Sequence, residues 1–571
     1  MSDRQTHYEL FVRKQPAAPW VLQFASEDRA KCLATAEELI GGGRVAAVRV
    51  TKEVLDPETR EFSSATILTK GDVAVLKQPK KAAEDFAPMC VSPTDLYTVH
   101  ARDRIGRLLD NWLKRKRVTV FELLHRPDLV ELLDASGMEI QHAVQRLAVP
   151  EAQARGMSVH EIIRAYQALI DRAIDRLVKD GRKKVFPKLT AATFAQAVAK
   201  CQGESESQYL LGGAVAGFIA TAPDWNAKVG LILDLVEAAP TEPKACALAI
   251  HVLEQPLQEI LGGQGALAEI IGPDQDLGAC LALLTRVAAE KEAAMLSQID
   301  PMVRRLIPPV EGALERLAKA LQREALRNVR AAVGKRILRE LNSPKRLRPN
   351  DADGEIALLR ALAMCLTATG GNLVSAEEVQ DAFHARSKSL VNSVFVDAYL
   401  ADRGTAMDEA MALVKLADNV VGASNKRDAA RWITATVGAL KFERELREGH
   451  GTPTEKLHLL ANLQRALSKA GMLAEDQAAA FARIGDIGAL VEADSSLTQQ
   501  LARSQAPLLQ KVRNLLRMAA GETAPIGPAS EKAKLEALKL LRTPDFRTQM
   551  AASPETLPTI RNLLASAGLA A

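Results

Sequence analysis

Aromatic residues are scarce in this chain of 571 residues, where Phe, Trp and Tyr together make up 4% of the sequence. Long segments are rich in Ala, Leu, Glu, Arg and Lys instead. These residues favour helices because they lose little side-chain freedom there. Hydrophobic residues still make up 47% of the chain, which is ordinary for a folded protein and excludes global disorder. The composition therefore predicts a mainly α protein.

The sequence also lacks a long apolar run. Its most apolar segment, residues 209–222, includes Gly212, Gly213 and Gly217 and is followed by Pro223. A membrane-spanning helix needs about 20 apolar residues, so a buried core helix is the better interpretation. We predict no transmembrane segment and, because the N-terminus has no secretory pattern, a cytoplasmic location.

Motifs for metal, cofactor and covalent chemistry are missing. The six cysteines and nine histidines are scattered, with no pair at the spacing of a zinc site. Residues 41–44 (GGGR) follow a predicted helix and lead into a strand, the reverse of the order in nucleotide-binding loops. No G-x-S-x-G nucleophile motif occurs. The sequence thus predicts no catalytic residues, no cofactor and no metal, although an enzyme whose site is assembled from distant residues stays open.

The first 70 residues differ in pattern from the rest. Short runs alternating β-branched or aromatic residues with polar ones predict strands at 8–14, 20–25, 45–55 and 62–69. Between the second and third strands, residues 27–40 place Leu33, Ala36 and Ile40 at helical spacing. This order predicts a small α+β (ββαββ) domain with the helix on one face of an antiparallel sheet.

From residue 94 onward the pattern is helical, with Ser, Thr, Asp, Gly and Pro between apolar-periodic segments. Predicted helices include residues 118–133, 158–179, 225–237 and 242–261. We predict an α+β module at residues 1–76, a linker at 77–93, an α-helical array at 94–345, a second helical segment at 346–522 and a C-terminal helical tail at 523–571. Short loops favour an irregular, solenoid-like array, because each helix must bury its apolar stripe on a neighbour; no known repeat period is visible.

One stretch concentrates positive charge. Residues 304–348 contain 13 Lys or Arg against four Glu, a net charge of +9, whereas the whole chain has +4. This stretch is predicted as one long helix, on which five basic residues form a stripe: Arg316, Lys319, Arg323, Arg327 and Arg330. Such a stripe is either a solvated helix face or a binding surface for an anionic partner.

These observations lead to three hypotheses. The first is a non-enzymatic helical scaffold or adaptor that binds other proteins, using the basic stripe to contact an acidic protein surface. The second is a regulatory protein associated with nucleic acid or with an anionic membrane surface. It is less favoured because the stripe has no aromatic residue for base stacking and no bulky apolar boundary. The third is the enzyme with a dispersed site.

Overall fold

The computed structural model describes residues 6–15, 20–55, 62–71, 88–272, 275–323 and 326–569. Two compact units divide the chain, residues 1–89 and residues 90–571. The first is a small α+β unit and the second is built from helices, so the predicted fold class is confirmed. The irregular, solenoid-like arrangement of the helical unit stays a prediction. The division of this unit into separate domains also stays a prediction. Residues 77–87 of the predicted linker lie outside the described residues.

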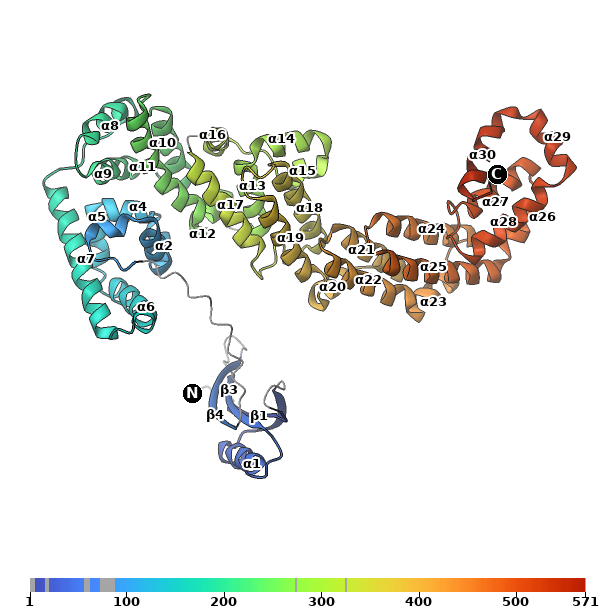
Figure 1. Cartoon of the computed structure of the whole chain (residues 1–571), viewed down its shortest axis with the longest axis horizontal. Helices are drawn as coiled ribbons and strands as arrows, with labels where there is room; N and C mark the ends of the chain where they lie inside the picture. Colours follow the sequence, from blue (N-terminus) through green and yellow to red (C-terminus); the bar gives the residue numbers. More distant parts are fainter. Residues whose placement is uncertain are drawn as a thin grey trace. The chain divides into compact units, whose positions relative to one another are not determined.

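The N-terminal unit is the predicted ββαββ module (Figure 1). Its elements are β1 (Thr6–Arg13), β2 (Val21–Ser26), α1 (Arg29–Gly41), β3 (Ala47–Leu55) and β4 (Phe62–Gly71). The strands form one antiparallel sheet in the order β2-β1-β3-β4, in which Leu10 of β1 pairs with Phe24 and Val50. Helix α1 begins where the Asp28 carboxylate accepts hydrogen bonds from two backbone N–H groups. Its Cys32 and Ala36 are buried against Leu10 and Val50.

The helical unit starts with a group of helices around a small core of its own. Trp112, Leu123 and Leu177 belong to this core. The elements are η1 (Pro93–Tyr97), α2 (Val99–Leu108), α3 (Asp110–Lys116), α4 (Val120–His125), α5 (Pro127–Asp134), α6 (Met138–Arg155) and α7 (Val159–Arg182). The single helix predicted at 118–133 is wrong: α4 ends at His125, because Pro127 cannot continue a helix and holds Arg126 in an extended conformation.

A second group of helices covers the middle of the chain. Its elements are η2 (Ala191–Thr193), α8 (Phe194–Gln202), α9 (Ser207–Ile219), α10 (Trp225–Glu237), α11 (Pro243–Gly262), α12 (Gln264–Ile271), α13 (Leu277–Ala288), α14 (Glu290–Ile299), α15 (Pro301–Leu306), α16 (Gly312–Leu321) and α17 (Arg327–Leu341). The predictions at 225–237 and 242–261 match α10 and α11 within one residue. Residues 209–219 of the apolar segment at 209–222 lie in α9, where most residues are buried. A side chain at Gly212 or Gly213 would clash with His125 or Phe186, so both glycines permit close packing.

The remaining helices extend to the C-terminal end. They are α18 (Ala352–Ala368), α19 (Ala376–Leu390), α20 (Ser393–Leu400), α21 (Ala406–Asn419), α22 (Ala423–Gly438), α23 (Leu440–Glu448), α24 (Pro453–Lys469), α25 (Ala474–Ser495), α26 (Leu497–Arg503), α27 (Leu508–Ala519), α28 (Pro528–Leu541), α29 (Pro544–Ala552), η4 (Pro554–Thr556) and α30 (Leu557–Ser566).

Most contacts in this unit join helices that are near neighbours along the chain, such as α21 with α22, α24 with α25 and α27 with α28. The segment boundaries predicted at 345/346 and 522/523 fall between helices, at α17–α18 and α27–α28. Helices on the two sides of each boundary contact one another: α17 contacts α19, and α27 contacts α28. Their buried side chains belong to one continuous apolar core.

Candidate functional site

The predicted basic stripe does not lie on one helix. Helix α16 ends at Leu321 and α17 begins at Arg327, so the single long helix was a wrong prediction. The carboxylate of Glu254, in α11, accepts hydrogen bonds from the backbone N–H and the side-chain amide of Asn328, at 2.9 and 2.7 Å. A carboxylate on free N–H groups stabilises a helix start. This cap comes from a distant helix, which explains why the local sequence shows no break.

Three members of the stripe make ion pairs or hydrogen bonds with other residues of the chain. The Arg316 guanidinium bridges two acids of α10, Asp234 at 2.8 Å and Glu237 at 3.0 Å. These carboxylates raise the pKa of Arg316. Lys319 pairs with Glu315 in its own helix at 2.6 Å, and Arg330 Nε donates to the Ala288 carbonyl at 3.2 Å. These contacts fix α16 on α10 and α17 on the end of α13.

The other two members flank the helix break. Arg323 lies in the turn after α16 and Arg327 is the first residue of α17; both are exposed. The five residues are therefore shared between two helices and a turn, and Arg316 and Arg330 have contacts that position helices. Whether the stripe binds a partner stays a prediction.

A different surface appears immediately before the stripe. In α14 and α15, which contact each other, three large apolar side chains are exposed: Met295 by 53%, Ile299 by 74% and Met302 by 41%. We call these three residues the α14–α15 patch. Met295 and Ile299 are four residues apart on α14 and share one face, while Ala293 of that helix is buried. Asp300 separates the two helices and accepts a hydrogen bond from Met302 N–H, at 2.8 Å.

Exposed arginines follow the patch directly. Arg304 and Arg305 lie in α15 and are the first basic residues of the charged stretch, while Val303 and Leu306 of the same helix are buried. Both arginines belong to the charged stretch found in the sequence, whereas the apolar patch was not predicted. The four-residue spacing of Met295 and Ile299 is the sequence signal for the patch, but the same spacing is typical of a buried helix face.

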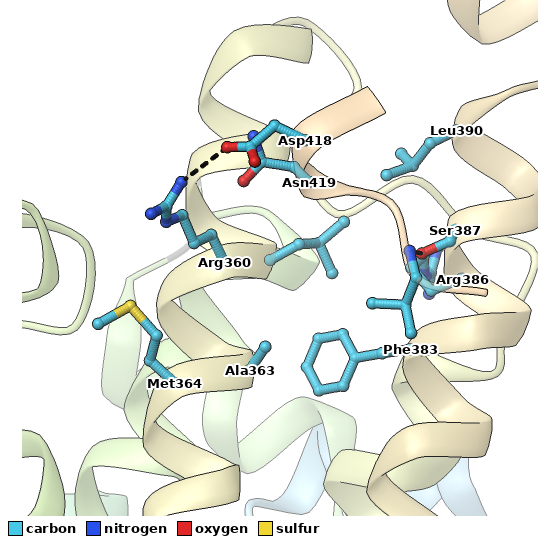
Figure 2. A pocket seen from close by; sticks show the side chains of 11 residues that line it. Arg360, Ala363, Met364, Phe383, Arg386, Ser387, Leu390, Asp418 and Asn419 are labelled. Carbon is cyan, nitrogen blue, oxygen red and sulfur yellow. Dashed lines mark hydrogen bonds and ion pairs between the residues drawn. The ribbon is translucent and has the colours of Figure 1, made fainter. Parts of the chain in front are cut away.

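A cavity of about 220 Å³ lies between α18, α19 and the end of α21. Figure 2 shows the side chains that line it. Its Arg360 forms an ion pair with Asp418 at 3.3 Å. Ser387 Oγ accepts a hydrogen bond from Val421 N–H at 2.9 Å, and Arg386 donates to the carbonyls of Glu340, Leu341 and Lys345. The hydrogen bonds of Ser387 and Arg386 join this cavity's walls to neighbouring segments, which is a structural role.

Buried charges gather where a lysine of α10 reaches α4. Glu122, at the start of α4, accepts hydrogen bonds from Lys228 Nζ of α10 at 2.8 and 2.9 Å. Lys228 also donates to the Arg117 carbonyl, and Arg126 approaches Glu122 at 3.5 Å. Burial lowers the pKa of Lys228, and the nearby Glu122 carboxylate opposes that shift. Each charge has a partner, as buried charges require.

A second buried acid lies close by in α11. Glu259 accepts a hydrogen bond from Phe121 N–H at 2.7 Å and lies 3.5 Å from Arg102. Burial raises the pKa of Glu259 to about 7, because loss of water outweighs the opposing effect of Arg102. A carboxylic acid with this pKa is suited to proton transfer at neutral pH. Neither Glu259 nor Arg102 is among the residues that line the cavity of Figure 2, the cavity among α2 to α7 or the cavity beside Trp112.

The N-terminal sheet combines aromatic and basic side chains. The Arg13 and Arg49 guanidinium groups lie over the Trp20 ring at 4.5 and 4.8 Å, and Arg49 also lies 5.4 Å from the centre of the Phe11 ring. Aromatic rings on a sheet can stack on nucleic-acid bases. Here the arginines already occupy ring faces of Trp20 and Phe11.

Two further tests concern metals and membranes. Across the described ranges, no group of three or more His, Cys, Asp or Glu side chains is arranged to hold a metal ion. No helix in the described part of the chain combines the length and apolar character needed to cross a membrane.

Comparison with known proteins gives no relative. No protein-family model matches the chain, and neither a curated protein nor a solved structure is significantly similar to it.

Proposed function

We propose that this protein is a non-enzymatic helical scaffold that binds another protein through the α14–α15 patch. The observation behind this proposal is the exposure of Met295, Ile299 and Met302 on two adjoining helices. Apolar side chains grouped on a surface are typical of protein interaction sites. Methionine suits such a site because its unbranched, polarisable side chain adapts to different partner shapes.

The chemistry around the patch supports a particular kind of partner. Arg304 and Arg305 are exposed beside it, at the start of a stretch with a net charge of +9. Arg and Met are both enriched in protein interfaces, where arginines pair with acidic groups around an apolar centre. We therefore propose a partner that presents an apolar side chain with Asp or Glu around it. The exposed stripe residue Arg323 adds to the positive field that would attract such a surface.

The two other hypotheses have less support. Nucleic-acid binding would need free aromatic faces, whereas the stripe has no aromatic and Arg13 and Arg49 lie over Trp20. Acid–base catalysis by Glu259 would need a substrate cavity beside it, whereas its carboxylate lies against Arg102 and accepts a hydrogen bond from Phe121 N–H. The scaffold proposal uses exposed groups that have no comparable internal role.

Removing the apolar centre of the patch tests this proposal. A partner is first identified by cross-linking from a photoreactive residue at position 298, an exposed position of α14 next to Ile299, and is then purified. The variant M295S/I299S should bind this purified partner at least about tenfold more weakly by calorimetry, because hot-spot residues contribute about 2 kcal/mol or more each.

Val394→Ser is the matched control, since Val394 is an 80% exposed apolar side chain in α20, away from the patch. It should bind like the unaltered protein. If M295S/I299S and Val394→Ser bind the partner equally well, the patch is not the binding surface. A charge-reversed pair, R304E/R305E, should weaken binding chiefly at low salt, where the Debye length is longest.

A further inference from the structure

A second feature with a functional consequence is a mostly apolar cavity of about 160 Å³ among helices α2 to α7, which is partly open to solvent. Aliphatic side chains form most of its wall, including Ile105, Leu123, Ile140, Leu169 and Ile174. Residues on both sides of the cavity are well buried, such as Leu133 of α5 and Leu169 of α7. The cavity adjoins the small core of the helices at the start of this unit and is separate from the α14–α15 patch.

The size of the cavity decides what it can hold. Protein interiors are close-packed and rarely leave voids much larger than a water molecule. A cavity of roughly 150 Å³ with an aliphatic wall stays dry and accepts a molecule of about the size of benzene. The present cavity has a similar size and a mostly aliphatic wall, and its partly open side gives a small molecule a route in. Water would gain few partners along such a wall, so an apolar occupant fits it better.

One polar atom on the cavity wall has no partner. The Nε2 atom of His100, in α2, is buried and makes no hydrogen bond to any described residue. Buried polar atoms are nearly always hydrogen-bonded, and an unpaired one indicates a missing group. A ligand with one oxygen could supply that partner, because a neutral imidazole nitrogen either donates or accepts a hydrogen bond.

The other polar groups near His100 are already engaged. Tyr166 OH donates to Glu151 at 2.9 Å, and Tyr97 OH donates to the Leu124 carbonyl at 3.2 Å. Glu151 also pairs with Arg104, which lies on the cavity wall, and with Arg155 at 3.2 Å. Because Arg104 already has a carboxylate partner, a ligand carboxylate would compete with Glu151 for it. An uncharged oxygen at His100 needs no such exchange.

We propose that this cavity is a binding site for a small, uncharged molecule with an apolar body of about one aromatic ring and a single hydroxyl or carbonyl group. The apolar body occupies the space between α2, α6 and α7. The oxygen forms a hydrogen bond with His100 Nε2.

Benzene and phenol are the probes for this site, because they differ by one hydroxyl. In the full chain with ¹³C-labelled isoleucine methyl groups, both should shift the signals of Ile105, Ile140, Ile170 and Ile174, which line the cavity. Ile433, in α22, should not move. Phenol should bind about tenfold more tightly than benzene, in line with one buried hydrogen bond. The variant His100→Phe should bind phenol and benzene with similar affinity, because it lacks the hydrogen-bonding nitrogen.

Filling the cavity provides the second test. Ala143→Phe places a ring on the cavity wall at α6 and should abolish binding of both probes, whereas Ala154→Phe, at an exposed position of the same helix, should not. Circular dichroism and melting check that each variant folds; Ala173→Leu on the α7 wall replaces Ala143→Phe if that variant unfolds.

Three results would overturn the proposal. The first is absence of any shift at the four isoleucines. The second is unchanged binding in the filled variant. The third is benzoate binding more tightly than phenol, which would indicate a charged ligand instead.

Discussion

Two regions of the helical unit place charged and apolar side chains in opposite ways. Between α4 and α10, the charged groups of Glu122 and Lys228 are buried, and each has a partner at hydrogen-bond distance. At α14 and α15, the large apolar side chains of Met295 and Ile299 face solvent instead, and Arg304 is exposed beside them. The first arrangement maintains the fold. The second leaves side chains available to another molecule.

The basic stripe lies between these two extremes. Its Arg316 is partly exposed, yet it bridges Asp234 and Glu237 of a neighbouring helix. A high local count of arginines therefore does not by itself identify a binding surface, because each internal ion pair lowers the charge presented to a partner. The surroundings of each side chain have to be known before stability and binding can be separated.

The largest expected effect concerns the buried pair. Lys228→Met should lower the free energy of unfolding by about 3–5 kcal/mol, because it leaves Glu122 charged and buried with Arg126 as its remaining cation. Chemical denaturation of Lys228→Met and of Lys469→Met, at an exposed position of α24, provides the measurement and its control. The double variant E122Q/K228M should regain part of the loss. Equal stability of Lys228→Met and Lys469→Met would contradict the role given to the pair.

A second, smaller effect should appear on acidification. His125 is buried in α4, its Nδ1 lies 2.8 Å from the Phe121 carbonyl, and burial lowers its pKa to about 4. The folded state thus favours the neutral ring. The contribution of this ring to the free energy of unfolding is present above pH 6.5 and is lost as the pH falls from 6.5 towards 4. The loss should reach about 3 kcal/mol, because one pKa unit corresponds to about 1.4 kcal/mol.

The unfolding free energy of His125→Gln, measured from pH 7 to pH 4, should fall less steeply than that of the unaltered protein. Carboxylates titrate in the same range, so His458→Gln, at an exposed position of α24, serves as the reference. If the unfolding free energies of His125→Gln and His458→Gln fall in parallel with pH, protonation of the buried His125 ring does not destabilise the fold.

Local sequence signals were sufficient for much of the fold. The four strands and the helix of the N-terminal module lie within about two residues of their predicted bounds. Their signals are local: apolar and polar residues alternate along the strands, Asp28 caps the start of α1, and glycines follow Ile40 at its end. The end of α4 was missed although Pro127 marks it, because an apolar pattern continues on both sides of that proline.

Long-range contacts account for what could not be predicted. The break between α16 and α17 depends on Glu254 of α11, which is more than 70 residues away in the sequence. The patch and the α2–α7 cavity depend on which helix faces are left uncovered, and the spacing of Met295 and Ile299 is the same in a buried helix. Nor does the sequence indicate that Nε2 of His100, among nine histidines, would be buried without a partner.

The smallest expected effect on stability concerns the exposed part of the stripe. The variant K319E/R323E should change the free energy of unfolding by no more than about 0.5 kcal/mol, because Lys319 is 65% exposed and its bond to Glu315 is a surface pair within one helix. Its effect on partner binding distinguishes the stripe from the patch. If both surfaces contribute, the partner captured through the α14–α15 patch should associate more slowly with K319E/R323E than with the unaltered protein, since rim charges act mainly on the association rate. This difference in rate should vanish at high salt, which screens the charges. An unchanged association rate at low salt would leave the patch as the binding surface and assign the stripe to the packing of α16 and α17 on α10 and α13.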